Sequence, residues 1–475
     1  MRRKSSFRAV GLLLAVAAMV RMAFLLRMEL PVFDPWRHLK LLQNLRAGRG
    51  FTLFDSQPYL WYVPLWYRLC AALPRWVQPQ WVAAWLSVIS VALAYLWARR
   101  LHDPNDRSAL HVGCMMAAFG PQVAFTCHYG AESFALTCML AALWVTAAAP
   151  DVSAAVAGGA LFGTAVCARL SLAFNVFLFF PVLRKGGSWV AFVGGAAAPL
   201  GLTWLRNHRV IASHPYVFLW DGLATPASGF HWLSTLVLPL HADVQEGLRT
   251  LHQGISPAPE WLQKWDLAAF MVLGVVCLFL SRRLSLILAG VSTLTYFLIL
   301  DRSRSSNFFR LYLGLFPVLF AAIALTAERG RRLRWGPALP WALTLLVVAC
   351  GVRFLEPLRM YPLEMVTPPP ELLTEDAYMV TSGFYNPESL LYRFPDKRFI
   401  GMPLRPEEFE DFHRRFPQYE LVLRRDFYNV QGDLDRYLVE GGGYEVVREA
   451  TNPYGVRYAV LAPRSRSGLD PRRHP

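Results

Sequence analysis

The sequence predicts a polytopic α-helical membrane protein with about eleven membrane spans and a C-terminal α/β domain outside the membrane. The first observation is composition: 55% of the 475 residues are hydrophobic and 17% are charged, against about 25% charged residues in a typical soluble domain. The second is that the long apolar runs stop near residue 355. The third is an alternation of strand and helix patterns in residues 356–463, which is typical of an α/β layer.

The membrane region, residues 1–355, is divided by the length that a membrane helix needs, about 20 apolar residues. Arg21 and Arg27 interrupt the outer half of the first run, so we interpret it as an uncleaved helix and not as a signal peptide. The predicted spans cover residues 9–28, 80–98, 109–126, 132–149, 153–169, 171–183, 188–205, 266–282, 284–300, 308–326 and 337–354.

The orientation is predicted from Lys and Arg in the short loops. With the N-terminus in the cytoplasm, the cytoplasmic segments include the basic stretches MRRKSSFR, RRLHDPNDR and ERGRRLRW. The loops 29–79 and 206–265 and the domain 356–463 then lie outside an inner or plasma membrane, and the basic tail 464–475 is expected to be disordered. The net charge of +15 follows largely from this topology. Because the basic residues are scattered over many loops, no nucleic-acid partner is expected.

The first external loop has internal structure. Asp34 and Pro35 predict a helix start, with Asp34 as the N-cap, and glycines end the helix at Gly48 and Gly50. A second piece, residues 59–74, is rich in Trp and Tyr and is expected to lie in the membrane interface. Long loops tend to be functional, so this loop is a natural place for a site.

The C-terminal domain and the cysteines complete the organisation. Strands are predicted at 377–382, 397–402, 419–427, 444–450 and 456–462, and helices at 387–394, 406–416 and 431–441. All seven cysteines lie in or beside predicted spans, and no CxxC pair occurs. We therefore expect them to pack as small apolar residues and not to form disulfides or bind zinc.

Five external residues are candidates for chemistry, each with a structural alternative. Asp34 is either a helix cap or a carboxylate that takes a proton from an acceptor at the membrane surface. Asp55 is either a turn residue or a partner carboxylate or metal ligand. Glu132 either offsets a helix dipole or is a functional acid at the edge of an apolar run. His38 and His128 are candidates for binding substrate or metal, and the alternative for His128 is that it simply faces water.

Arginines gather on the side that the topology rule would leave poor in cations. Each one alone would fit snorkelling to lipid phosphates. Together they indicate an anionic group held near the outer surface, because the guanidinium group matches phosphate oxygens. A substrate with a lipid tail, a phosphate and a polar headgroup fits this pattern. The arginines are Arg169, Arg206, Arg209, Arg302, Arg304 and Arg310.

The segments FDPWRHLKLLQNL, YGAESFAL and NFFRLYLGLFPVL, in this order and before an exported α/β domain, resemble the GT-C superfamily of polytopic glycosyltransferases. The resemblance implies a sugar donor linked to polyprenyl phosphate or diphosphate, and a lipid, glycan or protein acceptor. It implies that Asp34 is the base or the acceptor-binding carboxylate, and that Glu132 falls where the oligosaccharyltransferase subunit has metal-ligating acids. It implies that Arg310, with Arg169 or Arg206, holds the donor phosphate.

The chain also departs from that family. A WWDYG element is missing from the C-terminal domain, and LWDGLA at 219–224 is only a faint echo of it. Glu132 stands alone where an acidic pair is usual, so a sequon-directed oligosaccharyltransferase is not expected, and binding of Mg²⁺ or Mn²⁺ by Asp34 and Glu132 is left open. A transporter or flippase for a lipid-linked sugar would be expected to show internal repeats and mid-membrane acids. A non-catalytic scaffold would leave the external acids and arginines unexplained.

Overall fold

The computed structural model divides the chain into two compact units, one built from residues 1–29, 72–207 and 232–358 and the other from residues 30–71, 208–231 and 359–475. We call them the helical unit and the sheet unit. The structure describes residues 2–27, 34–52, 64–101, 107–127, 131–149, 151–183, 186–213, 217–219, 222–224, 265–301, 313–331, 336, 338–355, 364, 367–380, 390–391, 393–401, 406–424, 438 and 444–463.

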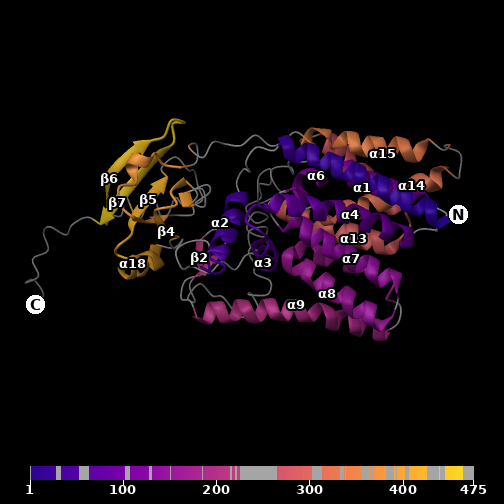
Figure 1. The fold of residues 1–475 in the computed structure, drawn as a ribbon, viewed down its shortest axis with the longest axis horizontal. Coiled ribbons are helices and arrows are strands. Elements are labelled where there is room, and N and C mark those ends of the chain that lie inside the picture. The colour runs from indigo at the N-terminus through magenta and orange to yellow at the C-terminus, as the bar shows by residue number, and fades with distance from the viewer. Residues whose placement is uncertain are drawn as a thin grey trace, which may run out of the picture. The chain divides into compact units, whose positions relative to one another are not determined.

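Within the described residues, each helix of the helical unit overlaps a predicted span, while the count of about eleven spans stays a prediction. Three of its helices are long and apolar enough to cross a membrane, over Arg8–Arg27, Pro79–Leu101 and Gly186–Val210, and further apolar helices are shorter. The last residues of α9 belong to the sheet unit. The helices are α1 (Arg2–Arg27), α4 (Pro79–Leu101), α5 (Ser108–Ala118), α6 (Gly120–Thr126), α7 (Glu132–Ala148), α8 (Val152–Ala168), the 3₁₀ helix η1 (Leu170–Phe179), α9 (Gly186–Ser213), α12 (Trp265–Leu280), α13 (Leu284–Asp301), α14 (Phe316–Gly330), α15 (Leu339–Cys350) and the 3₁₀ helix η5 (Val352–Leu355) (Figure 1).

Two predicted spans differ from the structure. The span 109–126 is broken at Phe119, where the backbone is extended between α5 and α6. Pro121 explains the break, because proline lacks an N–H and its ring clashes with the carbonyl four residues earlier in a continuous helix. The span 171–183 is the 3₁₀ helix η1, and not an α-helix. At about 2.0 Å per residue, a 3₁₀ helix covers more length with fewer residues than an α-helix.

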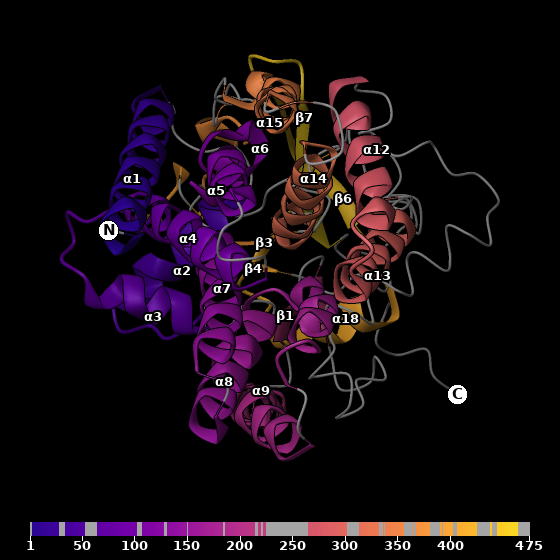
Figure 2. The same ribbon diagram turned by 90° about the vertical axis from the view of Figure 1, so that its right-hand side faces the viewer.

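Small residues let helices approach closely within this unit. A Cβ atom added at Gly159 of α8 would clash with the carbonyl of Phe192 in α9, and one at Gly163 would clash with that of Ala196. Such small residues favour tight helix packing inside membranes, where the hydrophobic effect does not drive helices together. α8 and α9 therefore lie side by side and run in the same direction (Figure 2).

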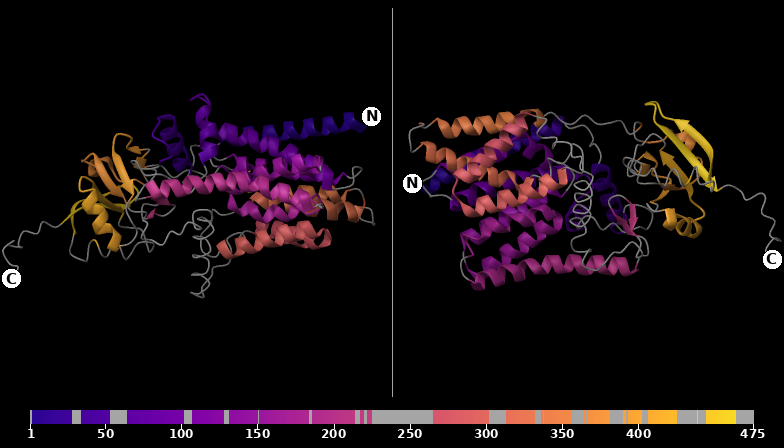
Figure 3. Two further views of the ribbon diagram at one scale, coloured as in Figure 1. Left: turned by 90° about the horizontal axis from the view of Figure 1, so that it is seen from below. Right: turned by 180° about the vertical axis from the view of Figure 1, so that it is seen from behind.

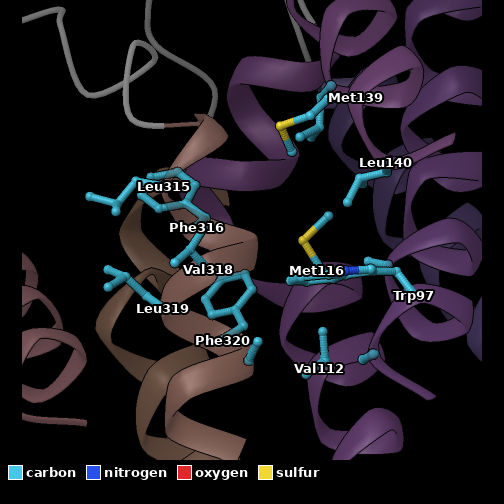
Figure 4. Close-up of a cluster of buried hydrophobic side chains, with 14 of the residues drawn as sticks. Trp97, Val112, Met116, Met139, Leu140, Leu315, Phe316, Val318, Leu319 and Phe320 are labelled. Atoms are coloured by element: carbon cyan, nitrogen blue, oxygen red, sulfur yellow. The ribbon is translucent and has the colours of Figure 1, made fainter. Parts of the chain in front are cut away.

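The core of the helical unit contains an aromatic cluster of Phe119, Phe270, Phe316 and Phe320. The ring centroid of Phe119 lies 4.6 Å from that of Phe270, 5.2 Å from that of Phe316 and 5.4 Å from that of Phe320. Figure 4 shows Phe316 and Phe320 of α14 across from Met116. Through this cluster, α12 and α14 pack against Phe119, the residue that follows α5.

The sheet unit contains a mixed five-stranded sheet with the strand order β4-β3-β5-β7-β6. β3 pairs in parallel with β4 and β5, and β7 pairs antiparallel with β5 and β6. Figure 3 shows the long β6–β7 pair at one edge. The elements are α2 (Asp34–Arg46), α3 (Pro64–Ala72, of which Ala72 falls in the helical unit), the antiparallel pair β1 (Val217–Leu219) and β2 (Gly222–Ala224), η6 (Pro370–Leu372), β3 (Ala377–Val380), β4 (Arg398–Gly401), α18 (Pro406–Arg415), β5 (Glu420–Arg424), β6 (Tyr444–Thr451) and β7 (Arg457–Pro463).

The five strands of the C-terminal part and its helix at 406–416 are confirmed. The predicted helices at 387–394 and 431–441 and the predicted disordered tail at 464–475 lie mostly or wholly outside the described residues. Each of the seven cysteines is buried or half-buried, as expected for small apolar side chains that pack in the interior.

Candidate functional site

Glu132 and Arg169 form an ion pair at the end of the helical unit where α7 begins and α8 ends. Glu132 is the first residue of α7, and Arg169 follows the last residue of α8. Glu132 is 5% exposed; its Oε1 pairs with Arg169, while its Oε2 is buried and has no hydrogen-bond partner. The pair therefore leaves one carboxylate oxygen open inside the protein.

A second predicted cation lies at the same end. The hydroxyl of Thr203 in α9 donates to the sulfur of Cys167 in α8 at 3.3 Å. Arg169 follows Cys167 by two residues and Arg206 follows Thr203 by three, so the two arginines lie at a similar level of this parallel helix pair, at the end of α8. Arg206 is half-buried and donates to the side chain of Asn207 at 3.0 Å.

Neutral polar groups are also buried without partners in this unit. Ser133 is 1% exposed and its hydroxyl is unpaired, and Gln122 and Asn175 are 0% exposed with both amide atoms unpaired. With Glu132, they form what we call the unpaired set. No sequence motif marks Ser133, Gln122 or Asn175, and their only signal is a polar residue inside an apolar run. Buried polar groups in proteins are usually hydrogen-bonded, so this set needs an explanation.

Arg21 of α1 is buried at 1% exposure in the same unit, but its guanidinium is satisfied. It donates to the hydroxyl of Ser87 at 2.6 Å, and to the carbonyls of Ala117 at 2.9 Å and Met116 at 3.1 Å. These carbonyls are available because α5 ends at Ala118, and the last carbonyls of a helix have no partner within it. The negative end of the helix dipole also favours a cation there.

The same bonds extend to α6. The hydroxyls of Ser87 and Thr126 lie 2.6 Å apart, and the Thr126 hydroxyl donates to the carbonyl of Gln122 at 2.5 Å. We call Arg21, Ser87, Thr126 and the two α5 carbonyls the Arg21 network. It fixes the short helix that carries Gln122.

In the first loop, α2 begins at Asp34 as predicted, and glycine at 48 follows its end with φ of 74°. The side chain of Asp34 is outside the described part of the structure. His38 is buried at 4% exposure, its Nδ1 bonds to the hydroxyl of Tyr67, and the two rings stack with centroids 5.6 Å apart. His38 therefore holds α2 against α3, and its predicted role in binding substrate or metal stays a prediction.

Comparison with known proteins found no matching family model and no matching curated protein. Several solved structures resemble the chain at low identity, among them these three. ArnT from Cupriavidus metallidurans, bound to undecaprenyl phosphate, is 15% identical over 97% of this chain and 99% of its own, with a TM-score of 0.52. The Archaeoglobus fulgidus oligosaccharyltransferase with zinc and sulfate is 12% identical over 94% of this chain and 72% of its own, with a TM-score of 0.52. AglB from the same organism, with an inhibitory peptide and a dolichol-phosphate, is 12% identical over 97% of this chain and 75% of its own, with a TM-score of 0.53.

The chain has the GT-C fold. The GT-C fold agrees with the predicted class of helical membrane protein. Asp55, His128 and Arg310 lie outside the described residues, as do Arg302 and Arg304, so their roles in this GT-C fold stay predictions.

Glu132 is a candidate ligand for a metal ion in the described part of the fold. Across the described ranges, no three His, Cys, Asp or Glu side chains come together to hold a metal ion. Glu132 offers its unpaired Oε2, and a carboxylate oxygen is the ligand type that Mg²⁺ and Mn²⁺ prefer. The sequence did not single out Asp266, which is 7% exposed in the first turn of α12.

Proposed function

We propose that the protein is a glycosyltransferase that moves a sugar from a polyprenyl-phosphate or diphosphate carrier to a lipid, glycan or protein acceptor, at the external face of an inner or plasma membrane. The observation that carries this proposal is the Glu132–Arg169 pair, with its open carboxylate oxygen, in a GT-C fold where Arg206 lies at a similar level of the adjoining helix. ArnT, which matches the chain over 97% of its length, was solved with undecaprenyl phosphate, and this supports a lipid phosphate as ligand.

The donor phosphate would be bound by Arg169, Arg206 and Arg310. A guanidinium group matches two phosphate oxygens at once and stays charged at every physiological pH. Arg169 is already paired with Glu132, which orients it before the donor arrives. The phosphate would then share Arg169 with Glu132, while Arg206 and Arg310 supply further positive charge.

The transfer needs a base and a stabilised leaving group. The hydroxyl or amide of the acceptor attacks the anomeric carbon of the sugar, from the face opposite the phosphate. The bond between that carbon and the phosphate oxygen breaks, and the electron pair leaves with the lipid phosphate. Asp34 takes the proton of the acceptor, and the arginines stabilise the charge that develops on the leaving phosphate.

Glu132 Oε2 would be one oxygen ligand of a divalent cation. When bound, Mg²⁺ or Mn²⁺ would neutralise negative charge on the donor phosphate. Asp34 is the second residue that we propose for it, on the resemblance alone. The proton transfer to Asp34 and the role of the arginines do not depend on the cation.

The test is Asp34→Asn in membranes that contain the purified protein, an acceptor extract and undecaprenyl phosphate carrying a labelled sugar from a panel of hexoses and pentoses. General base catalysis contributes about 10²- to 10⁴-fold, so we expect transfer to fall at least about 100-fold while expression and folding are kept. The matched control is Asp151→Asn, because Asp151 also starts a helix and accepts from the amide of Ala154 at 2.7 Å.

The control should transfer sugar like the unaltered protein. Full activity of Asp34→Asn would show that Asp34 is not the base. No transfer from any member of the panel by the unaltered protein would overturn the proposed function itself.

A further inference from the structure

Two amide side chains of the helical unit, Asn175 and Gln122, are buried with all their hydrogen-bonding groups unused. Both are 0% exposed, and in both the nitrogen and the oxygen of the amide lack a partner. A buried amide without partners loses its bonds to water and gains none in return, so it weakens the folded state. Strain or unpaired groups of this kind tend to be kept where function uses them.

The two amides come from different helices, η1 and α6, and each can be related to a residue of the aromatic cluster. A Cβ atom added at Gly314 would lie 3.0 Å from the Asn175 nitrogen, so the backbone at Gly314 passes directly over this amide. Gly314 precedes Phe316 by two residues, and Gln122 follows Phe119 by three. The rings of Phe119 and Phe316 are 5.2 Å apart, which links the two positions through a pair of contacting side chains.

The hydrogen-bonding groups of the two amides indicate which kind of ligand they could bind. An uncharged amide offers two donors and an acceptor, and a hydroxyl group donates and accepts at the same time. A phosphate would call for cations and a metal ion for carboxylates, and neither Asn175 nor Gln122 supplies these. Aromatic side chains next to a few placed polar groups are the usual lining of a site for a small organic ligand.

We infer that Asn175 and Gln122 bind hydroxyl groups of the transferred sugar, an inference that rests on the proposed function. The two residues thus recognise the sugar, while the arginines hold the phosphate. Before the donor binds, the amides are unpaired, and the sugar completes their hydrogen bonds. The competing explanation is that ordered water occupies the same positions.

The first measurement is thermal stability of the full chain in detergent, with Asn175→Leu and Gln122→Met as shape-conserving apolar replacements. Because the replaced amides make no bonds, we expect both variants to melt at or above the temperature of the unaltered protein. The matched control is Asn452→Leu. Asn452 is 4% exposed, donates to the carbonyl of Glu364 at 2.7 Å and accepts from the amide of Val456 at 3.0 Å, so this variant should melt lower.

The second measurement is binding of two probes: undecaprenyl phosphate alone, and undecaprenyl phosphate carrying glucose, galactose, mannose or arabinose. We expect the unaltered protein to bind at least one sugar-bearing lipid more tightly than the bare lipid. Asn175→Leu and Gln122→Met should each lose about ten-fold in affinity for that lipid, the size of one good hydrogen bond. Both variants should bind the bare lipid like the unaltered protein, and Asn452→Leu should bind both probes normally.

The outcomes separate the inference from the function beneath it. Four results would each overturn the sugar-binding role and leave the proposed transferase function intact. Two concern affinity: the variants bind the sugar-bearing lipid normally, or they lose equal affinity for bare and sugar-bearing lipid. The other two are that the sugar adds no affinity in the unaltered protein, or that the variants melt as low as Asn452→Leu. An unaltered protein that binds neither probe would instead overturn the proposed function.

Discussion

The helical unit contains two buried polar clusters in opposite states, the Arg21 network and the unpaired set. Arg21 is 1% exposed, and its guanidinium donates to Ser87 and to main-chain carbonyls of α5 and of its own helix. Glu132, Gln122 and Asn175 are buried to a similar degree, yet each keeps side-chain atoms without any partner. Burial of a polar residue inside a membrane unit therefore does not by itself indicate a site. The two clusters differ in whether their side-chain donors and acceptors have hydrogen-bond partners within the protein.

The two clusters are also connected, which gives them different tasks. Arg21 binds carbonyls that the break at Phe119 sets free, and Thr126 carries the network into α6. α6 bears Gln122, whose carbonyl accepts from Thr126 while its side-chain amide stays open. We infer that the satisfied cluster is a support that holds part of the open one in place.

The largest effect is expected from removing the support. Arg21→Leu leaves the carbonyls of Met116 and Ala117 and the hydroxyl of Ser87 without their donor inside the bundle. Losing several charge-assisted bonds should cost about 3 kcal/mol of folding stability, measured by thermal unfolding in detergent.

The matched control is Arg8→Leu, on the exposed part of the same helix, which should leave stability nearly unchanged. Arg21→Lys keeps the charge but not the fork of donors, and should fall between the two. If Arg21→Leu melts at the same temperature as Arg8→Leu, the Arg21 network does not stabilise the helical unit, and its contrast with the unpaired set does not hold.

An intermediate effect is expected at the ion pair, and it separates stability from transfer. Glu132→Gln leaves Arg169 without its buried counter-charge and should cost about 2 kcal/mol. Glu132→Gln with Arg169→Gln removes both charges and should regain most of that stability. Because we place both residues at the donor phosphate, transfer should stay at least about 100-fold low in the double variant.

Thermal unfolding and the sugar-transfer assay on the same preparations decide this. A double variant that regains both stability and transfer would show that the pair only stabilises the fold. A double variant that regains neither would show that the two residues do not act mainly on each other.

The helices could be predicted from the sequence because a membrane span must be apolar over its whole length and must satisfy its own backbone. α7 runs over Glu132–Ala148 where residues 132–149 were expected, and α4 runs over Pro79–Leu101 where 80–98 were expected. The break at Phe119 was missed although Pro121 signals it, because hydropathy alone does not register a lost hydrogen bond.

Only part of the candidate site could be predicted from the sequence. Glu132 and Arg169 stand out as charges at the ends of apolar runs, but their pairing depends on two helices lying side by side, which no local pattern encodes. Asn175 and Gln122 carry neither charge nor motif, so only the packed structure shows that their amides are unpaired. Asp34 and Arg310 are candidates from their predicted place on the external side of the membrane, the family resemblance adds their specific roles, and these roles stay predictions.

The smallest effect is expected in the sheet unit, where a satisfied polar pair titrates. The hydroxyl of Tyr444 in β6 and Nδ1 of His413 in α18 lie 2.8 Å apart, and the His413 ring stacks on Phe409 with centroids 5.8 Å apart. Burial lowers the pKa of His413 below its ordinary value of 6.5. The folded state therefore binds the proton less readily than the unfolded chain does.

It follows that the neutral ring stabilises this unit fully above pH 6.5, and that the contribution is lost as the pH falls from there through the lowered pKa of the folded state. Hydrogen exchange of the β6 and α18 amides, corrected for intrinsic rates, should show faster opening at pH 5 than at pH 7.5. His413→Phe keeps the stack on Phe409 and removes the titrating group, so its exchange should depend less on pH. Equal pH dependence in the variant would mean that other groups set it. A loss of pH dependence would show that the half-buried His413 sets the response of this pair to protons, whereas the Arg21 network, built on a group that stays charged, should not respond over this range.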